Sequence, residues 1–495
     1  MGDGSVQART DLAGRRVLVA GLGISGRAAG AALVARGALV VTLDERADAD
    51  LHAVAAADLA RFDLVVASPG WPPHHPVLAA AVERGLPVWS EVELAWRLRA
   101  DRAERAEHGG AASAGRPVRG PAPWLVVTGT NGKTTTVGML SAILVAAGER
   151  GPAVGNVGTP IVSIATDPEV DVLAVELSSF QLHFTTSMEA EAAVVLNVAP
   201  DHLDWHGGPG AYLAAKAKVY EGVRVACVYD TSDPRLAGLV RAADVADGAR
   251  AVGLTLGAPG VGEIGLVGGL LVDRAFHTAA DDPHRQASAV ELADLGDLAH
   301  LAGPGGVVAP HVVSNALAAA ALARAHGVPA AAVRSGLRAD QPGAHRATVV
   351  RTLDEVGYVD DSKATNAHAA AASLAAFAPG SVVWIAGGLA KGAAFDDLVR
   401  DRLDRLRGVV LIGMDAAGFE QALARHAPAI PVVRIDPADT GTVMTRAVAA
   451  ARRLARSGDT VLLAPACASM DQFDSYAARG DAFADVVTGL GPQEA

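Results

Sequence analysis

A short glycine-rich run offers the clearest chemistry in the sequence. Residues 128–135 read TGTNGKTT, between an apolar run at 125–128 that predicts a strand and a stretch at 135–147 that predicts a helix. Backbone amides of such a loop surround phosphates, a lysine adds charge near the β- and γ-phosphates, and a hydroxyl reaches Mg²⁺. The loop has two residues fewer between its glycines than G-x-x-x-x-G-K-[ST]. The residues predicted to bind ATP phosphates are Gly129, Thr130, Asn131, Gly132, Lys133, Thr134 and Thr135.

A second glycine cluster lies near the N-terminus. Residues 21–26 read GLGISG after an apolar run at 17–20, and Asp44 ends the next apolar run, 18 residues beyond Gly26. Glycines at such a turn let a phosphate approach a helix N-terminus, and an acidic residue at this distance can hold a ribose. The pattern fits an NAD(P) site, another nucleotide site, or tight packing alone. Residues 68–70 predict a second loop at the same sheet edge, or a plain turn.

The overall composition sets the class of protein. The chain has 495 residues, 51% hydrophobic and 19% charged, so most of it can fold and global disorder is excluded. Its net charge of −12 argues against a general nucleic-acid or anionic-membrane binder. The two cysteines exclude a disulfide framework and favour a reducing compartment. Because no run approaches the roughly 18 apolar residues of a membrane span, we expect a cytoplasmic protein.

Short apolar runs alternate with alanine-rich helical stretches along almost the whole chain. This alternation predicts parallel sheets covered by helices. The predicted strands are 17–20, 39–43, 64–67, 125–128, 172–175, 193–196, 382–386, 409–412, 432–435 and 461–464. The predicted helices are 27–36, 76–84, 135–147, 314–326 and 442–457. A chain of this length predicts about three such domains.

Breaks in the alternation predict the domain boundaries. Residues 100–123 are rich in Gly, Ala, Pro and charge, and predict a linker or surface insertion. Residues 257–306 predict an irregular hairpin region, and a helical stretch ends at Pro342. The predicted domains are therefore 1–99, 124–342 and 343–495, with the linker at 100–123.

Eight sequence blocks in a fixed order resemble one enzyme family. They are TGTNGKTTT at 128–136, GNVG at 155–158, ELSSFQL at 176–182, DHLD at 201–204, HR at 345–346, DSKATN at 361–366, GGLAKG at 387–392 and PACAS at 465–469. The set resembles the Mur ligases, which add amino acids to the peptidoglycan precursor, and it spans nearly the whole chain. The N-terminal glycine cluster and the last three blocks resemble the members of the family that add D-glutamate.

The resemblance implies an ATP-dependent amide ligase of cytoplasmic peptidoglycan precursor synthesis. Such an enzyme joins D-glutamate to UDP-N-acetylmuramoyl-L-alanine through an acyl phosphate, with Mg²⁺ or Mn²⁺ as the metal ion. The implied fold has three α/β domains. These are a Rossmann-like N-terminal domain for the UDP-sugar, a central P-loop ATPase-like domain with a mostly parallel sheet for ATP and metal, and a Rossmann-like C-terminal domain for the amino acid. A monomer with small-molecule substrates, and with no nucleic-acid or membrane partner, is expected.

The resemblance also implies roles for individual residues. The metal ion is assigned to Thr134, Glu176, His202 and Lys216, and catalysis to Lys133, Lys216, Lys363 and His202. Beyond the phosphate loop, ATP is assigned to Asn315, Arg346 and Asp361, although Asn315 is also an ordinary polar residue for a helix N-terminus. The UDP-sugar is assigned to Ser25, Asp44, Arg46, Ser68, Gly70, Asn156 and Gln181. The amino acid is assigned to Thr365, Lys391, Ser469 and Tyr476.

Lys216 carries the most unusual of these assignments. It lies four residues after Tyr212 in a stretch with helical spacing, so both side chains share one face. The resemblance implies a lysine carbamylated by CO₂, whose negative charge helps hold the metal ion. Carbamylation requires a depressed lysine pKa, because only the neutral amine reacts with CO₂. Taken alone, a lysine on a helix is ordinarily a solvated surface residue.

Other classes of protein fit parts of the sequence. An NAD-dependent oxidoreductase explains the first glycine cluster but leaves the ATP loop and residues 361–366 unexplained. A nucleotide-dependent switch explains the ATP loop but not Glu176, His202 and Lys216. Within the family, a folate enzyme that adds glutamate is the alternative, but it has no need of a UDP-type domain. The positions that depart from the family pattern are Asp230, Val312, Leu389 and Ala394.

Overall fold

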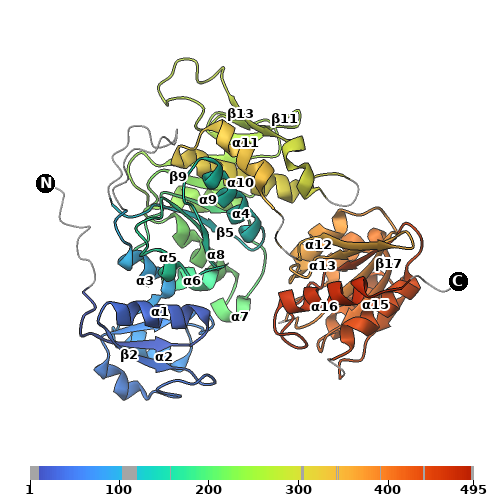
Figure 1. Ribbon diagram of the computed structural model, residues 1–495, viewed down its shortest axis with the longest axis horizontal. Helices are drawn as coiled ribbons and strands as arrows, with labels where there is room; N and C mark the ends of the chain where they lie inside the picture. Colours follow the sequence, from blue (N-terminus) through green and yellow to red (C-terminus); the bar gives the residue numbers. More distant parts are fainter. Residues whose placement is uncertain are drawn as a thin grey trace. The chain divides into compact units, whose positions relative to one another are not determined.

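The computed structural model consists of two compact units. It describes residues 11–102, 120–156, 158–302, 306–341, 343, 345–390, 392–438 and 441–491. The first unit runs to His300 and includes Val312–Asp340, and the second comprises Leu301–His311 and the chain from Gln341 onward. Three mostly parallel sheets covered by helices confirm the predicted α/β fold class (Figure 1). The domain boundaries drawn from the sequence stay predictions.

The first sheet lies at the start of the first unit and is parallel throughout, in the order β2-β1-β3-β4. Its strands are β1 (Arg16–Ala20), β2 (Leu39–Leu43), β3 (Leu64–Ala67) and β4 (Val88–Ser90). The helices are α1 (Ile24–Ala35), α2 (Pro76–Glu83) and α3 (Glu91–Leu98), with a 3₁₀ turn at Ala56–Arg61. β3 is buried along its whole length, as expected for an apolar strand with helices on both faces.

The central sheet completes the first unit, in the order β13-β12-β11-β10-β9-β8-β5-β7-β6. Its strands are β5 (Trp124–Thr128), β6 (Ala153–Gly155), β7 (Leu173–Glu176), β8 (Ala192–Val195), β9 (Ala226–Asp230), β10 (Arg250–Leu254), β11 (Glu263–Val267), β12 (Leu270–Asp273) and β13 (Val290–Asp294). The strands from β6 to β11 are parallel, whereas β11, β12 and β13 pair antiparallel. The hairpin predicted within 257–306 is therefore present and extends this sheet.

Helices on the central sheet carry several of the residues assigned to ATP and metal. They are α4 (Lys133–Ala146), α5 (Ile161–Ile164), α6 (Ser179–His183), α7 (Leu203–His206), α8 (Pro209–Ala217), α9 (Pro234–Ala242), α10 (Pro310–His326) and α11 (Ala330–Ala339), with 3₁₀ turns at Lys218–Tyr220 and Leu295–Leu301. α10 begins four residues before the predicted start, and its buried face is made mostly of alanine. Because alanine side chains are small, the backbone of α10 can lie close to the elements that it packs against.

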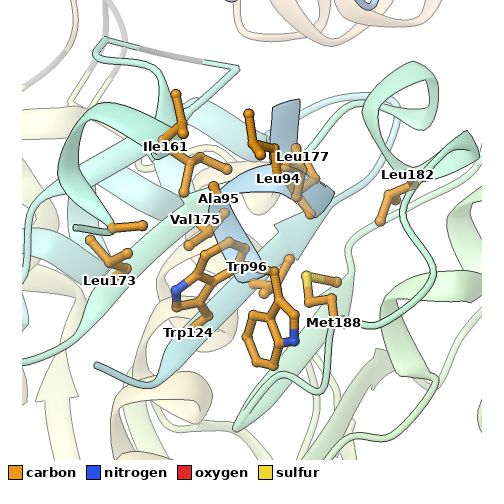
Figure 2. Close-up of a cluster of buried hydrophobic side chains, with 14 of the residues drawn as sticks. Leu94, Ala95, Trp96, Trp124, Ile161, Leu173, Val175, Leu177, Leu182 and Met188 are labelled. Carbon is orange, nitrogen blue, oxygen red and sulfur yellow. The ribbon is translucent and has the colours of Figure 1, made fainter. Parts of the chain in front are cut away.

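A shared hydrophobic core joins the first sheet to the central sheet. Trp96 of α3 meets Trp124 of β5 edge to face, with ring centroids 4.9 Å apart. Figure 2 shows these two rings among side chains from β7, α5 and α6, including Leu173, Ile161 and Leu182. Because this core is continuous and closely packed, α3 fixes the first sheet in place against the central sheet.

The third sheet makes up most of the second unit, in the order β14-β15-β19-β16-β17-β18. Its strands are β14 (Thr348–Leu353), β15 (Val356–Asp360), β16 (Val382–Gly387), β17 (Leu406–Ile412), β18 (Val432–Arg434) and β19 (Thr460–Leu463). The helices are α12 (Ala367–Ala375), α13 (Asp396–Arg402), α14 (Ala417–His426), α15 (Val443–Leu454) and α16 (Tyr476–Thr488), with a 3₁₀ turn at Leu403–Arg405. β14 and β15 form an antiparallel hairpin, and the other pairs are parallel. In the part of the chain that the structure describes, no helix combines the length and apolar character of a membrane span.

Candidate active site

The predicted ATP loop connects β5 to α4 at the carboxyl end of the central sheet. Gly132 has a left-handed backbone with φ of +85°, and α4 begins at Lys133, with Thr134 and Thr135 in its first turn. A Cβ atom at position 132 would lie 2.4 Å from Oδ1 of Asn315. Both the backbone and the available space therefore require glycine. Asn315 of α10, one of the residues assigned to ATP, lies against the loop and is buried.

Side chains fix the shape of this loop. The Asn131 amide donates a hydrogen bond to Oδ1 of Asn197 at 2.9 Å, and Nδ2 of Asn197 donates to the Asn131 carbonyl at 3.0 Å. Nζ of Lys133 donates to the carbonyls of Gly129 and Thr130, each at 3.0 Å. The Lys133 ammonium thus lies over the loop, where it can neutralise phosphate charge.

Lys216 lies beside the same loop and is 1% exposed. Its Nζ donates to the Gly129 carbonyl at 2.8 Å and lies 4.6 Å from the ring centroid of Tyr212, so the predicted shared helix face is present. The Tyr212 hydroxyl lies 2.9 Å from Oγ1 of Thr130. Burial holds the pKa of Lys216 well below its ordinary value, and the charge of Lys133 lowers this pKa further. The environment therefore favours the neutral amine that CO₂ requires.

Glu176 ends β7 and is 1% exposed. Its Oε1 accepts a hydrogen bond from Nδ2 of Asn156 at 2.8 Å, while Oε2 is buried and has no partner among the described residues. A buried carboxylate oxygen in this state is unfavourable unless a cation or a proton satisfies it. This position therefore fits a hard metal ion such as Mg²⁺ or Mn²⁺. Asn156, which the resemblance assigns to the UDP-sugar, here holds Glu176.

His202 and Gln181 occupy constrained positions near the same sheet edge. His202 has a left-handed backbone with φ of 51°, and its ring centroid lies 4.6 Å from that of Phe180. Oε1 of Gln181 accepts hydrogen bonds from the amide and the hydroxyl of Ser178, at 2.9 and 3.0 Å, which caps α6. The Gln181 oxygen is thus occupied by a helix cap, and its contact with the substrate stays a prediction.

His, Cys, Asp and Glu side chains alone do not build a metal cage at this place. Over the described ranges, no group of three or more such side chains could hold a metal ion. Glu176 and His202 would therefore need oxygen ligands of another kind, such as the Thr134 hydroxyl, phosphate, or a carbamate on Lys216. The ligand set that the resemblance implies stays a prediction.

The first glycine cluster forms the expected turn between β1 and α1. A Cβ atom at Gly21 would lie 2.7 Å from Cβ of Ser68, and one at Gly26 would lie 1.8 Å from the Gly21 carbonyl oxygen. Tight packing therefore explains these two glycines without any ligand. Ser25 lies in the first turn of α1, and Ser68 and Gly70 lie in the loop after β3, at the sheet edge where ligands of parallel sheets bind.

Asp44 is turned back onto that glycine turn. Its Oδ2 accepts a hydrogen bond from the Leu22 amide at 2.6 Å, and its Oδ1 accepts from the amides of Arg46 and Ala47, each at 2.9 Å. These hydrogen bonds lower the pKa of Asp44 to about 2. Asp44 therefore shapes the turn, while Arg46 is exposed beside it. Their contacts with a UDP-sugar stay predictions.

In the second unit, several assigned residues lie close together after β15. Partial burial raises the pKa of Asp361 to about 6, and the charge of Arg346 opposes that rise. Oδ1 of Asp361 accepts a hydrogen bond from the Ala347 amide at 3.3 Å. Nζ of Lys363 lies 3.9 Å from the ring centroid of Tyr476, a cation–π distance. The unit thus brings Arg346, Asp361, Lys363 and Tyr476 into one neighbourhood.

Arg479 of α16 belongs to this neighbourhood, and sequence reasoning missed it. It is 1% exposed, and it donates to Oγ of Ser362 at 3.0 Å, to the Ser362 carbonyl at 2.9 Å and to the Cys467 carbonyl at 3.1 Å. Burial lowers its pKa to about 10. Arg479 thereby ties the loop after β15 to the 465–469 block. A signal was available, since Arg479 precedes Phe483 by four residues on a buried helix face.

The other residues assigned to the amino acid are placed less fully. Ser469 is 4% exposed, Thr365 is half-buried, and Lys391 lies outside the described residues. Cys467 and Cys227 are buried free thiols, and burial raises the pKa of each to about 12. Thiols in this state are poor nucleophiles near neutral pH. Both therefore serve as small packing residues.

The departures from the family pattern have modest structural effects. Leu389 pairs through its backbone, since its amide donates to the Ala468 carbonyl at 2.9 Å and its carbonyl accepts from the Ala468 amide at 3.2 Å. Asp230 ends β9 and accepts from the Ser232 amide at 2.8 Å. Val312 lies in the first turn of α10. Nothing in the structure explains Ala394.

Comparison with known proteins defines the class of enzyme. The family description "Mur ligase middle domain" matches residues 127–323, and "Mur ligase, glutamate ligase domain" matches residues 345–467. These stretches carry the ATP loop, Glu176, Lys216 and the loop after β15. Fold and site together are those of an ATP-dependent amide ligase.

Relatives resemble the chain over nearly its full length. The UDP-N-acetylmuramoylalanine–D-glutamate ligase of Streptomyces avermitilis is 55% identical over 97% of this chain and 100% of its own length. That of Streptomyces coelicolor is 54% identical over 97% and 99%. A UDP-N-acetylmuramate–alanine ligase structure from Thermotoga maritima shares the fold, with a TM-score of 0.55, 16% identity, and coverage of 96% and 99%. The chain belongs to the Mur ligase family.

Proposed function

We propose that this chain uses ATP to join D-glutamate to UDP-N-acetylmuramoyl-L-alanine in peptidoglycan precursor synthesis. The observation that carries the proposal is the 55% identity to an enzyme named for this reaction, over 97% of this chain and all of the relative. The similarity extends beyond the ATP machinery, since it also spans the first sheet, where a UDP-sugar is expected to bind. A folate enzyme has no use for that sheet.

The proposed reaction has two steps. The terminal phosphoryl group of ATP forms a bond to a carboxylate oxygen of the L-alanyl substrate, and its bond to ADP breaks. The amine of D-glutamate then attacks the acyl carbon, phosphate leaves, and the amine loses a proton. Lys133 and Lys363 are proposed to neutralise charge on the transferred group, which is the main need in phosphoryl transfer.

Glu176 is proposed to be the central metal ligand, because its Oε2 is buried without a partner among the described residues. Thr134, His202 and a carbamate on Lys216 would complete the ligand set. Bound Mg²⁺, or Mn²⁺ in its place, would offset negative charge on the phosphates and the acyl substrate. Asn156 would keep Glu176 in place by holding its other oxygen.

The proposed carbamate on Lys216 rests on burial and on the hydrogen bond to the loop. Its nitrogen would form a bond to the carbon of CO₂ and lose a proton, which converts a potential cation into an anion. Such a change suits a side chain that lies beside Lys133. Intact-protein mass under CO₂-preserving conditions should show the mass of one added CO₂. An unmodified mass together with full activity of Lys216→Ala would refute this proposal.

The compartment proposed for the reaction is the cytoplasm, which supplies ATP and keeps thiols such as those of Cys227 and Cys467 reduced. A monomer is proposed as the working form. Size-exclusion chromatography with light scattering would test whether the protein is a monomer.

The decisive experiment is phosphate release with UDP-N-acetylmuramoyl-L-alanine, ATP and Mg²⁺. Each reaction contains D-glutamate, L-glutamate or another amino acid, and the product mass is measured. Release with D-glutamate only, with the mass of the amide product, is the expected result. Release with a different amino acid would keep the ligase chemistry but overturn the substrate. Nucleotide binding without release in any mixture would overturn the ligase proposal.

A further inference from the structure

Glu91 is a buried carboxyl group that the proposed reaction does not use. It is the first residue of α3 and is 2% exposed. Its Oε1 accepts a hydrogen bond from the Val162 amide at 2.7 Å, while Oε2 is buried without a partner among the described residues. Burial raises the pKa of Glu91 to about 7. A buried carboxyl oxygen without a hydrogen bond lowers the stability of the folded protein. We therefore asked what the hydrogen bond to the Val162 amide provides in return.

That contact fixes the start of α5 from outside. Pro160 precedes α5 and provides no side-chain cap, so Glu91 supplies the acceptor that the local sequence lacks. Just before Pro160, the Gly155 amide donates to the Thr159 carbonyl at 3.2 Å and closes a turn. Glu91 therefore anchors the end at which this turn joins α5.

The beginning of the same turn holds the proposed metal ligand. The Asn156 amide donates to the Glu176 carbonyl at 2.9 Å, and Nδ2 of Asn156 donates to Oε1 of Glu176 at 2.8 Å. These two bonds leave Oε2 of Glu176 as the oxygen without a partner. A movement of the turn would move Asn156, and would thereby change which way the Glu176 carboxylate faces.

Glu93, two residues further along α3, is a buried carboxylate whose oxygens are all hydrogen-bonded, and it serves as a comparison for Glu91. Its oxygens accept from the amides of Thr186 and Ser187 at 2.8 and 3.0 Å, from the Ser187 hydroxyl at 2.7 Å and from Nε of Arg97 at 2.6 Å. Glu93 is fully satisfied and fastens α3 to the central sheet. The hydrogen bonds of Glu91 are instead directed at the amides of Ile161 and Val162 at the start of α5, which follows the turn that carries Asn156.

We infer that Glu91 is a positioning residue for the ligase reaction. By holding the Val162 amide it fixes the turn that carries Asn156, and Asn156 presents Oε2 of Glu176 to the metal ion. The inference rests on the proposed function for its role in turnover, but not for its effect on the turn or on metal binding. It also gives the first sheet, through α3, a direct part in shaping the metal site.

The test compares Glu91→Ala and Glu91→Gln, with the exposed Glu83→Ala of α2 as a matched control. Glutamine keeps the acceptor and removes the charge, so it should restore what alanine loses. In the free protein, amide hydrogen exchange across residues 153–164 should be about tenfold faster in Glu91→Ala and unchanged in the other two. Mn²⁺ affinity with a non-hydrolysable ATP analogue, measured by electron paramagnetic resonance, should fall about tenfold in Glu91→Ala only.

Turnover provides a third readout. Below the unfolding temperature of every variant, Glu91→Ala should lower kcat about tenfold, while KM for the UDP-sugar stays within about twofold. Unchanged hydrogen exchange in Glu91→Ala would overturn the inference. Faster exchange with unchanged Mn²⁺ affinity would also overturn it, because Glu91 would then only cap α5. A wild-type protein that binds Mn²⁺ and nucleotide but does not use D-glutamate would overturn the proposed function instead, and the first two readouts would still decide the role of Glu91. If Glu91→Ala does not fold, Glu91→Leu fills the space without an acceptor and takes its place.

Discussion

The ion pairs of His326 predict that the first unit loses stability as pH rises above neutrality. This side chain, at the end of α10, is 12% exposed. Its Nδ1 lies 2.7 Å from Glu191, and its Nε2 lies 3.1 Å from Glu149. Burial alone would lower the pKa of His326, but the hydrogen bonds with the two carboxylates outweigh burial and raise it from 6.5 to about 9. The folded state therefore keeps this proton at pH values where the unfolded chain has released it.

The size of the effect follows from the two pKa values. A tenfold change in a protonation equilibrium corresponds to about 1.4 kcal/mol, so the proton on His326 contributes about 3 kcal/mol to the free energy of unfolding. This contribution is fully present below pH 6.5, the unfolded value, and is lost as pH rises through about 9. His326→Gln lacks the proton at every pH and removes the positive charge that faces Glu191 and Glu149, so it should be less stable than the wild type by several kcal/mol at pH 6.5.

Urea unfolding followed by tryptophan fluorescence measures this difference. Five of the six tryptophans lie in the first unit, so the signal reports mainly on that unit. The stability advantage of the wild type over His326→Gln should shrink by about 3 kcal/mol between pH 6.5 and pH 9.5. The exposed His284→Gln is the control, and its difference from the wild type should stay constant. A constant advantage over His326→Gln across this range would refute the reasoning.

Three substitutions test other parts of the first unit. Lys133→Ala should lower turnover at least about 100-fold while leaving UDP-sugar binding nearly intact, and equal loss of both in calorimetry would contradict the separate roles of the two sheets. Gly132→Ala strains a left-handed residue by roughly 1–2 kcal/mol and pushes on Asn315, so ATP affinity should fall about tenfold or more, whereas unchanged affinity would show that the loop adapts. Gly336→Ala would place a Cβ atom 2.3 Å from Cα of Ile143, so the unfolding free energy should fall by roughly 1–3 kcal/mol with kcat preserved at low temperature. A loss of kcat without a loss of stability would contradict this last expectation.

Predictions from the sequence succeeded where a local pattern determines a local structure. The strands predicted at 39–43 and 64–67 match β2 and β3, because each is an apolar run that ends at a polar residue or a turn. The shared face of Tyr212 and Lys216 follows from helical spacing alone. The start of α10 at Pro310 was missed, although proline is favoured at a first helical position and could have indicated this start.

Contacts between distant segments were beyond the reach of sequence patterns. Nothing near Asp44 in the sequence indicates that its carboxylate accepts from the Leu22 amide, because that contact depends on how β1 and β2 align. The hydrogen bond from Asn156 to Glu176 depends in the same way on the pairing of β6 with β7. Glu91 and Arg479 lie in helices outside every motif, and only their burial in the folded chain distinguishes them.

The two buried cysteines make the chain well suited to distance measurements by fluorescence. Cys227 and Cys467 lie in different units, and with a pKa of about 12 each should react slowly with maleimides. A cysteine introduced on the surface of each unit would therefore take a dye without removal of the native thiols. Energy transfer between the two dyes, with and without ATP, would report the separation of the units in solution. The native thiols should therefore stay unlabelled, a condition that in most proteins requires replacement of the native cysteines.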